Sequence, residues 1–317
     1  LTKGRGILCQ GEQVKYAFVQ AQLRAYPLSL ACETLGVCVS GYHAWKHRLP
    51  APRTLEQQRL LFLIKTIYHR WGGVYGAPRI CAALRTEHAY TGSVNRIKAL
   101  MRAHGIRAKT RKKFKATTDS NHKLPIAANL LAEVQNQPSA PNQVFVSDIT
   151  YIRTQEGWLY LAVVMDLYTR AIVGWALKSR MAADLVLDAL TMAWFRKRPG
   201  SGAIFHSDRG SQYASKALRK RLVQYRMRQS MSGKGNCFDN AAMESFWKTL
   251  KTERVYLQKT YETRQIAKAD IVAYMEMFYN PERLHSALGY RSPHQFEQQH
   301  YETLLKQKRS AKSSTKS

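Results

Sequence analysis

The sequence has few cysteines and no long apolar run. Its five cysteines are an odd number without a closely spaced pair, which argues against a disulfide framework and favours a reducing compartment. No apolar stretch approaches the roughly 20 residues needed to span a bilayer, and residues 1–9 lack an apolar region long enough for a signal peptide. We therefore expect a cytoplasmic protein that makes no use of a membrane.

Acidic residues are also scarce relative to basic ones. Lysine and arginine number 50 against 21 aspartates and glutamates, which gives a formal net charge of +29. A surface this basic attracts the phosphate backbone of nucleic acids through counterion release. Ribosomal and membrane-surface proteins share this balance, so charge alone does not identify a DNA-processing enzyme. The 317 residues, 45% of them hydrophobic, suffice for two or three folded domains.

The second half of the chain has the pattern of a mixed α/β domain. Runs rich in β-branched and aromatic residues, bounded by turn signals, predict strands at 144–152, 158–165, 171–177, 203–208 and 227–231. Helical periodicity predicts helices at 182–195, at 215–225 and from about residue 240. This order of three strands followed by alternating helices and strands is that of the ribonuclease-H-like fold, in which the first and fourth strands are neighbours.

Three acidic residues occupy special places in this predicted fold. Asp148 lies in the first strand, Asp208 ends the fourth strand, and Glu244 lies in the first turns of a helix, with 35 residues between it and Asp208. Carboxylates on neighbouring strands repel each other unless a cation lies between them. Such hard oxygen ligands suit Mg²⁺ or Mn²⁺, and two such ions can promote in-line phosphoryl transfer. The pattern indicates metal-dependent phosphodiester chemistry without a protein nucleophile.

Two lysines follow Glu244 on the same predicted helix. Lys248 and Lys251 lie four and seven residues on, so at about 100° per residue all three share one face. The lysines are candidates for holding the phosphates that flank the scissile bond. A solvated stripe of salt bridges is the alternative interpretation.

Four segments carry a family resemblance. They are VSDITY at 146–151, HSDRGSQY at 206–213, NCFDNAAMESFW at 236–247 and YNPERLHSALGY at 279–290. Together they resemble the OrfB-type catalytic subunit of insertion-sequence family three transposases, which have a retroviral-integrase-like DDE core. The resemblance covers roughly residues 20 to 300. It implies that Asp148, Asp208 and Glu244 are the catalytic, metal-binding triad and that Lys251 is the basic residue that follows the glutamate.

The resemblance also implies a reaction and partners. Members of this family carry out copy-out-paste-in transposition on double-stranded DNA, acting on element terminal inverted repeats and on target DNA. We expect a homo-oligomer on DNA, associated with the nucleoid. The first residue is not methionine, which hints at expression as a fusion with an upstream-frame protein that carries another helix-turn-helix and a leucine zipper.

Residues 1–50 predict a first all-α DNA-binding unit. Helices are expected at 28–35 and 41–48, with Gly36 in the turn and Ser40 as the N-cap, which is a helix-turn-helix arrangement. The second helix then suits insertion into a DNA groove. A helical pair used only for packing is the alternative.

The second predicted helix of this unit carries a basic side chain between two histidines. Lys46, flanked by His43 and His47, is the candidate for DNA contact. With Cys32 and Cys38 the histidines have a superficial zinc-finger order. The segment between the cysteine pair and the histidine pair is too short for a zinc finger, so we favour the helix-turn-helix without metal.

Residues 51–106 predict a second helical DNA-binding unit. Its helices are expected at 55–69, from about Pro78 to 85, and from an N-cap at Ser93 to 104. The candidates for DNA contact are Arg79, Asn95, Arg96 and Lys98. Each of them is otherwise a solvated surface residue.

The remaining segments complete the predicted domain organisation. Residues 107–137 form a basic linker, in which Arg111, Lys112, Lys113 and Lys115 are candidates for tracking the DNA backbone. An inert solvated loop is the alternative. The ribonuclease-H-like DDE integrase core is predicted at 138–300, and a basic disordered tail at 301–317.

Other acidic residues and other functions compete with this interpretation. Asp166 is expected to cap a turn or to pair with Arg170, and Asp239 to cap a helix start, so substitution of either by Asn should leave activity largely intact. A DNA-binding regulator or an inactive remnant of a transposase is the main alternative. A tyrosine recombinase is a weaker one, because its constellation of arginine, histidine and tyrosine is not visible.

Overall fold

A computed structural model describes residues 5–49, 51–109, 125–133, 137–233, 241–258 and 260–314. The chain divides into two compact units, Leu1–Thr66 and Ile67–Ser317. The division falls inside helix α5 (Pro52–Arg70), after the proline-rich joint.

The first unit is a small helical bundle. Its helices are α1 (Arg5–Leu8), α2 (Glu12–Gln22), α3 (Leu28–Thr34), α4 (Val39–His47) and the first part of α5. The two predicted helices are confirmed as α3 and α4, with Gly36 at φ 63° between them. The predicted cap was wrong. Ser40 lies inside the first turn of α4, and Cys38 Sγ instead accepts a hydrogen bond from the Gly41 N–H at 3.1 Å.

Helices α6 (Ala77–His88) and α7 (Val94–Ala103) belong to the second unit and confirm the predicted helical pair. Pro78 lies in the first turn of α6, where no backbone N–H is needed. The Ser93 hydroxyl accepts from the Arg96 N–H at 3.2 Å and so caps α7, as predicted. The buried side chains of the two helices include Ile80, Leu84, Ile97 and Leu100.

A five-stranded mixed sheet forms the centre of the second unit. Its strands are β1 (Val144–Thr154), β2 (Gly157–Asp166), β3 (Ile172–Lys178), β4 (Ile204–Ser207) and β5 (Arg228–Met231). The spatial order is β3-β2-β1-β4-β5, with β1, β2 and β3 antiparallel and with β4 parallel to both β1 and β5. The first and fourth strands are neighbours, as predicted.

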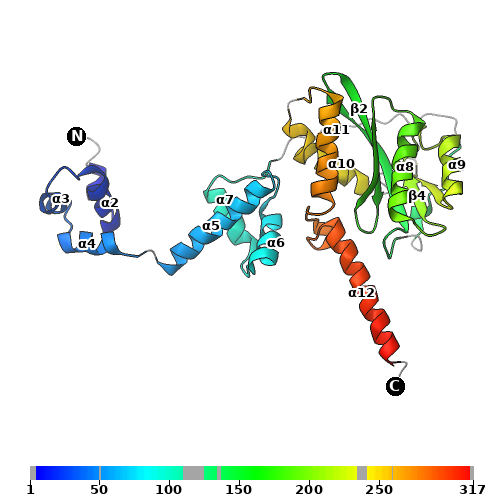
Figure 1. Ribbon diagram of the computed structural model, residues 1–317. Helices are drawn as coiled ribbons and strands as arrows, with labels where there is room; N and C mark the ends of the chain where they lie inside the picture. Colours follow the sequence, from blue (N-terminus) through cyan, green and yellow to red (C-terminus); the bar gives the residue numbers. More distant parts are fainter. Residues whose placement is uncertain are drawn as a thin grey trace. The chain divides into compact units, whose positions relative to one another are not determined.

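Helices cover both faces of the sheet (Figure 1). Helices α8 (Ala183–Lys197) and α9 (Lys216–Gln224) lie on one face, and α10 (Ala241–Glu253) and α11 (Arg264–Ala273) lie on the other. Alternate residues of β1 supply the two cores: Val144 and Val146 pack with α10, whereas Phe145 packs with α8 and α9. This arrangement confirms the predicted ribonuclease-H-like α/β core.

The C-terminal segments hold to the core through specific contacts. A π-helical turn, Tyr274–Tyr279, continues α11, and the amide of Asn280 both donates to and accepts from the backbone of Ile172 in β3. Three short 3-10 helices are Leu130–Ala132, Val255–Leu257 and Ser286–Leu288. None of the helices in the described ranges is long and apolar enough to cross a membrane.

The last helix, α12, spans Pro293–Ser314. The prediction of disorder from residue 301 was wrong for the described residues, because residues 301–314 continue this helix. The first half of α12 is anchored to the core: Lys197 pairs with Glu297, and the Tyr168 hydroxyl lies 3.1 Å from His300 Nδ1. An anchored helix extends more readily than an isolated one, because its nucleation is already achieved.

Candidate active site

The strand register places Asp148 and Asp208 side by side. Strands β1 and β4 are parallel, and their last paired positions are Ser147 and Ser207. Asp148 is the next residue of β1, and Asp208 is the residue that directly follows the end of β4. Equivalent positions on neighbouring strands lie about 5 Å apart and project to the same face. The two carboxylates therefore lie close enough for the charge of Asp208 to raise the pKa of Asp148, and their role as a catalytic pair stays a prediction.

The environment of Asp148 disfavours its ionised form. Burial, followed by the negative charge of Asp208, raises the pKa of Asp148 to about 7, and Glu244 adds a smaller increase. Hydrogen bonds from the Trp247 indole N–H to Oδ2 and from the Ile149 N–H to Oδ1, both at 2.8 Å, oppose this rise. A cation bound between the carboxylates would offset this repulsion and would favour the ionised form of Asp148.

Asp208 is oriented by the turn that follows β4. Its Oδ1 accepts from the Gly210 N–H at 2.9 Å, which holds the carboxylate at the strand end. Behind the aspartates lies Tyr213, whose hydroxyl is 3.0 Å from Ser147 Oγ. The pKa of Tyr213 is raised well above its usual value by burial and by the charges of Asp148 and Asp208, which again places both carboxylates in one small region.

Glu244 approaches from the opposite layer. It lies in the first turn of α10 and is exposed, while Met243, Phe246 and Trp247 on the same helix are buried against the sheet. Its charge contributes to the raised pKa of Asp148, so the glutamate lies near the aspartates. The described residues nevertheless include no group of three His, Cys, Asp or Glu side chains arranged to hold one metal ion.

The two lysines of α10 differ in their surroundings. Lys248 is exposed. Lys251 is partly buried, and its ammonium nitrogen lies 5.5 Å from the ring centre of Tyr151. Burial lowers the pKa of Lys251, and the negative charge of Asp148 opposes that change, so this lysine is the cation beside the aspartates. Lys251 therefore lies near Asp148, whereas exposed Lys248 fits the solvated alternative equally well, and contact of either lysine with phosphates stays a prediction.

Trp247 is the part of this site that sequence reasoning missed. Its indole is 8% exposed and donates to Asp148 from the neighbouring layer. The signal was present in the sequence, because a tryptophan three residues after Glu244 lies within one turn of it and a buried indole N–H requires an acceptor. Which acceptor it finds depends on how α10 packs on β1.

Asp166 has the structural role that was expected of it. It is 1% exposed, and Oδ1 accepts from the Thr169 backbone N–H at 2.7 Å and from the Thr169 hydroxyl at 2.9 Å. Its Oδ2 accepts from the Asn142 N–H. These bonds close the turn between β2 and β3. Asp239, the other predicted cap, lies outside the described residues.

The candidates for DNA contact are only partly placed. Lys46 on α4 and Lys98 on α7 are exposed, and Arg96 on α7 is partly buried. Each remains a candidate. The predicted linker contacts Arg111, Lys112, Lys113 and Lys115 lie outside the described residues.

Arg79 has a role within the protein instead. Its Nε donates to the Leu284 carbonyl oxygen at 3.0 Å, and its guanidinium lies 3.4 Å from Glu253 Oε1. Glu253 is also held by Arg283 and by the Tyr274 hydroxyl. These contacts tie α6 to the end of α10 and engage two of the three guanidinium nitrogens of Arg79, and its predicted contact with DNA stays untested.

Family models match both the helical N-terminal part and the α/β core of this chain. Family models described as "Integrase core domain" match residues 138–237 and 244–301, and one described as "HTH-like domain" matches residues 55–114. Among solved structures, the HTLV-2 integrase catalytic core domain in complex with magnesium is similar, with a TM-score of 0.40 and 14% identity. That match covers 51% of this chain and 99% of that one.

Curated relatives match nearly the whole chain. The insertion element IS600 uncharacterized 31 kDa protein of Shigella sonnei is 44% identical over 274 residues, which cover 86% of this chain and 98% of that protein. Transposase InsF for insertion sequence IS3A of Escherichia coli (strain K12) is 41% identical over 287 residues, with coverages of 90% and 98%. This chain therefore belongs to the IS3-family transposases, enzymes of the polynucleotidyl transferase class with an integrase core.

Proposed function

We propose that this transposase cleaves DNA at the ends of an insertion sequence and joins the freed strands, with Asp148, Asp208 and Glu244 as its catalytic, metal-binding residues. The observation that carries the proposal is that Asp148 and Asp208 directly follow Ser147 and Ser207, the last paired residues of β1 and β4, and that the charge of Asp208 acts on Asp148. The raised pKa of Asp148 supports it, because strongly shifted pKa values cluster at functional sites.

The donor set fits a hard divalent cation. Three carboxylates offer only oxygen ligands, which suit Mg²⁺ or Mn²⁺ rather than zinc. Two such ions, when bound, would lower the pKa of an attacking hydroxyl and stabilise the leaving oxygen of an in-line displacement. Trp247 and Gly210 hold the two aspartates in fixed orientations, because each donates a hydrogen bond to one carboxylate oxygen. Lys251 supplies a positive charge for a neighbouring phosphate.

The order of strand events follows the family expectation. We propose that one element end is nicked to expose a 3′-hydroxyl, which attacks the same strand beside the other end. A circular intermediate would result and would later be inserted into target DNA. Family membership supports this copy-out-paste-in order of steps.

DNA is the partner that the helix-turn-helix units would position. Exposed Lys46 and Lys98, with Arg96, are the proposed contacts within the described residues. The basic linker remains part of this proposal. We further propose a homo-oligomer on terminal inverted repeats at the nucleoid.

A strand-cleavage assay on DNA with matched terminal repeats tests the proposal. We expect Mg²⁺-dependent nicking by the wild-type chain, and a loss of at least about a thousandfold in Asp148→Asn, Asp208→Asn and Glu244→Gln with DNA affinity retained. Asp188→Asn is the matched control, since Asp188 is an exposed carboxylate on α8 that shares Lys178 with Asp184.

The same assay separates the alternative function. DNA binding without nicking at any divalent ion concentration would identify a regulator or an inactive remnant. Nicking that survives in all three carboxylate variants would exclude this site as the catalytic centre.

A further inference from the structure

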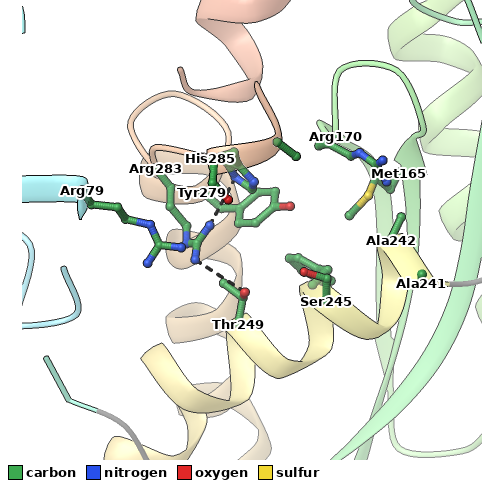
Figure 2. Close-up of a pocket in the computed structure, with 13 residues that line it drawn as sticks. Arg79, Met165, Arg170, Ala241, Ala242, Ser245, Thr249, Tyr279, Arg283 and His285 are labelled. Carbon is green, nitrogen blue, oxygen red and sulfur yellow. Dashed lines mark hydrogen bonds between the residues drawn. The ribbon is translucent and has the colours of Figure 1, made fainter. Parts of the chain in front are cut away.

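A cavity lies on the side of α10 that faces away from Trp247 and Asp148. It has a volume of about 250 Å³ and is lined on one side by α10, through Ser245 and Thr249 among others. On a helix these residues lie roughly opposite Trp247, which contacts Asp148. The remaining wall comes from the C-terminal segment around Tyr279 and from the turn between β2 and β3 (Figure 2).

The charge around this cavity is unbalanced. Three guanidinium groups line it, those of Arg79, Arg170 and Arg283. Arg79 and Arg283 share Glu253, which lies 3.4 Å and 2.6 Å from them. The guanidinium of Arg170 makes no hydrogen bond or ion pair with any described residue. Figure 2 shows it on the side of the cavity opposite Arg283.

The surroundings of Arg170 emphasise this imbalance. Burial lowers the pKa of Arg170, and the neighbouring Tyr279, followed by the negative charge of Asp166, offsets only part of the effect. Asp166 already accepts hydrogen bonds from Asn142 and Thr169. A partly buried guanidinium with free donors is therefore left facing the cavity, and such donors favour an anion.

Neutral donors complete the wall. Burial, followed by the charge of Arg283, lowers the pKa of His285 to about 3, so its imidazole is neutral near pH 7. Its Nε2 lies 3.4 Å from an Arg283 nitrogen and acts as acceptor, because arginine only donates; the imidazole proton is then on Nδ1. The hydroxyls of Ser245 and Thr249 add further polar groups without adding charge.

We propose that this cavity binds a phosphate oxyanion, supplied by a phosphodiester of the DNA strand near the active site. The inference deepens the proposed function and rests on it. Ser245, which lines the cavity, directly follows Glu244 on α10, so the cavity lies next to one of the proposed catalytic carboxylates. Exposed Ser245, Ser286 and Ala287 leave the cavity open at the surface, where a strand can reach it. Arg170 would donate to the phosphate oxygens in bidentate fashion.

Binding in EDTA tests this site apart from cleavage. The probes are inorganic phosphate, measured by calorimetry against chloride at equal ionic strength, and a single-stranded oligonucleotide, measured by fluorescence anisotropy across a salt series. The variant is Arg170→Gln and the matched control is Arg226→Gln. Both arginines have left-handed backbones, with φ 62° and 54°, but Arg226 is exposed outside the cavity, so charge and backbone strain change equally.

We expect Arg170→Gln to weaken phosphate binding at least tenfold, and Arg226→Gln to change it less than twofold. For the oligonucleotide, the slope of log affinity against log salt should fall by about 0.7 in Arg170→Gln, the value for one lost phosphate contact on a single strand. Arg226→Gln should keep the wild-type slope.

Three outcomes overturn the proposal. A wild-type chain without measurable phosphate binding refutes it, whatever the stability of the variant. Equal effects of the two substitutions refute the assignment to this cavity. Weaker phosphate binding with an unchanged oligonucleotide slope refutes DNA as the source and leaves a site for free anions. Because no cleavage is measured, a failure of the proposed catalysis does not alter these results.

Discussion

Asp148 should make the stability of the metal-free protein depend on pH. Its pKa is about 7 in the folded chain, against a reference value of 3.8. Between these values the folded chain keeps a proton that the unfolded chain has lost. The stabilising contribution is therefore complete below about pH 4 and is lost as pH rises through 7. A difference of about 3 pKa units corresponds to about 4 kcal/mol.

Comparison of the wild type with Asp148→Asn isolates this contribution. Asparagine does not titrate, and it adds a pH-independent cost because its amide cannot accept from both Ile149 and Trp247. The difference in free energy of unfolding, wild type minus variant, should fall by about 4 kcal/mol between pH 4 and pH 8. For a cooperative unit of this size, that is a relative shift in Tm of roughly 10 °C.

Scanning calorimetry in EDTA measures the effect, and the transition of the second unit is the one to follow. Adding Mg²⁺ should raise the wild-type Tm at pH 8 and leave Asp148→Asn unchanged, because a bound cation stabilises the ionised carboxylate. Parallel Tm curves for the two proteins across pH 4–8 would refute the repulsive carboxylate cluster on which the active-site assignment depends.

Three further substitutions test the packing around the site. Glu253→Gln leaves a buried guanidinium without its counter-charge and should lower the free energy of unfolding by about 3–5 kcal/mol, measured by urea denaturation. Gly174→Ala should also destabilise, by about 2 kcal/mol or more in the same assay, because its Cβ would collide with the Ala189 carbonyl. Trp247→Phe removes the indole donor to Asp148, so the acid limb of the pH profile of Mg²⁺-dependent cleavage should move upward by about one pH unit. An unchanged profile would mean that this hydrogen bond does not orient the carboxylate during the reaction.

Local sequence patterns were sufficient to predict most of the strands and helices of the α/β core. Alternation along residues 144–152 predicted β1, and the order of elements predicted that β1 and β4 would be neighbours. The prediction of disorder after residue 300 failed because a composition rich in Lys, Ser and Thr does not reveal anchoring. The ion pair between Glu297 and Lys197 comes from residues 100 positions apart.

The sequence by itself determined the fold class and the family and singled out the three acidic residues that we propose as catalytic, because periodicity and motif spacing are local properties of the chain. Only the tertiary structure decided that Trp247 holds Asp148, that Arg79 docks against Glu253 and that Arg170 faces a cavity without a hydrogen-bond partner among the described residues. These contacts join residues far apart in the chain, Arg79 and Glu253 by 174 positions. Their formation depends on how whole helices pack against the sheet, and no short segment of sequence carries that information.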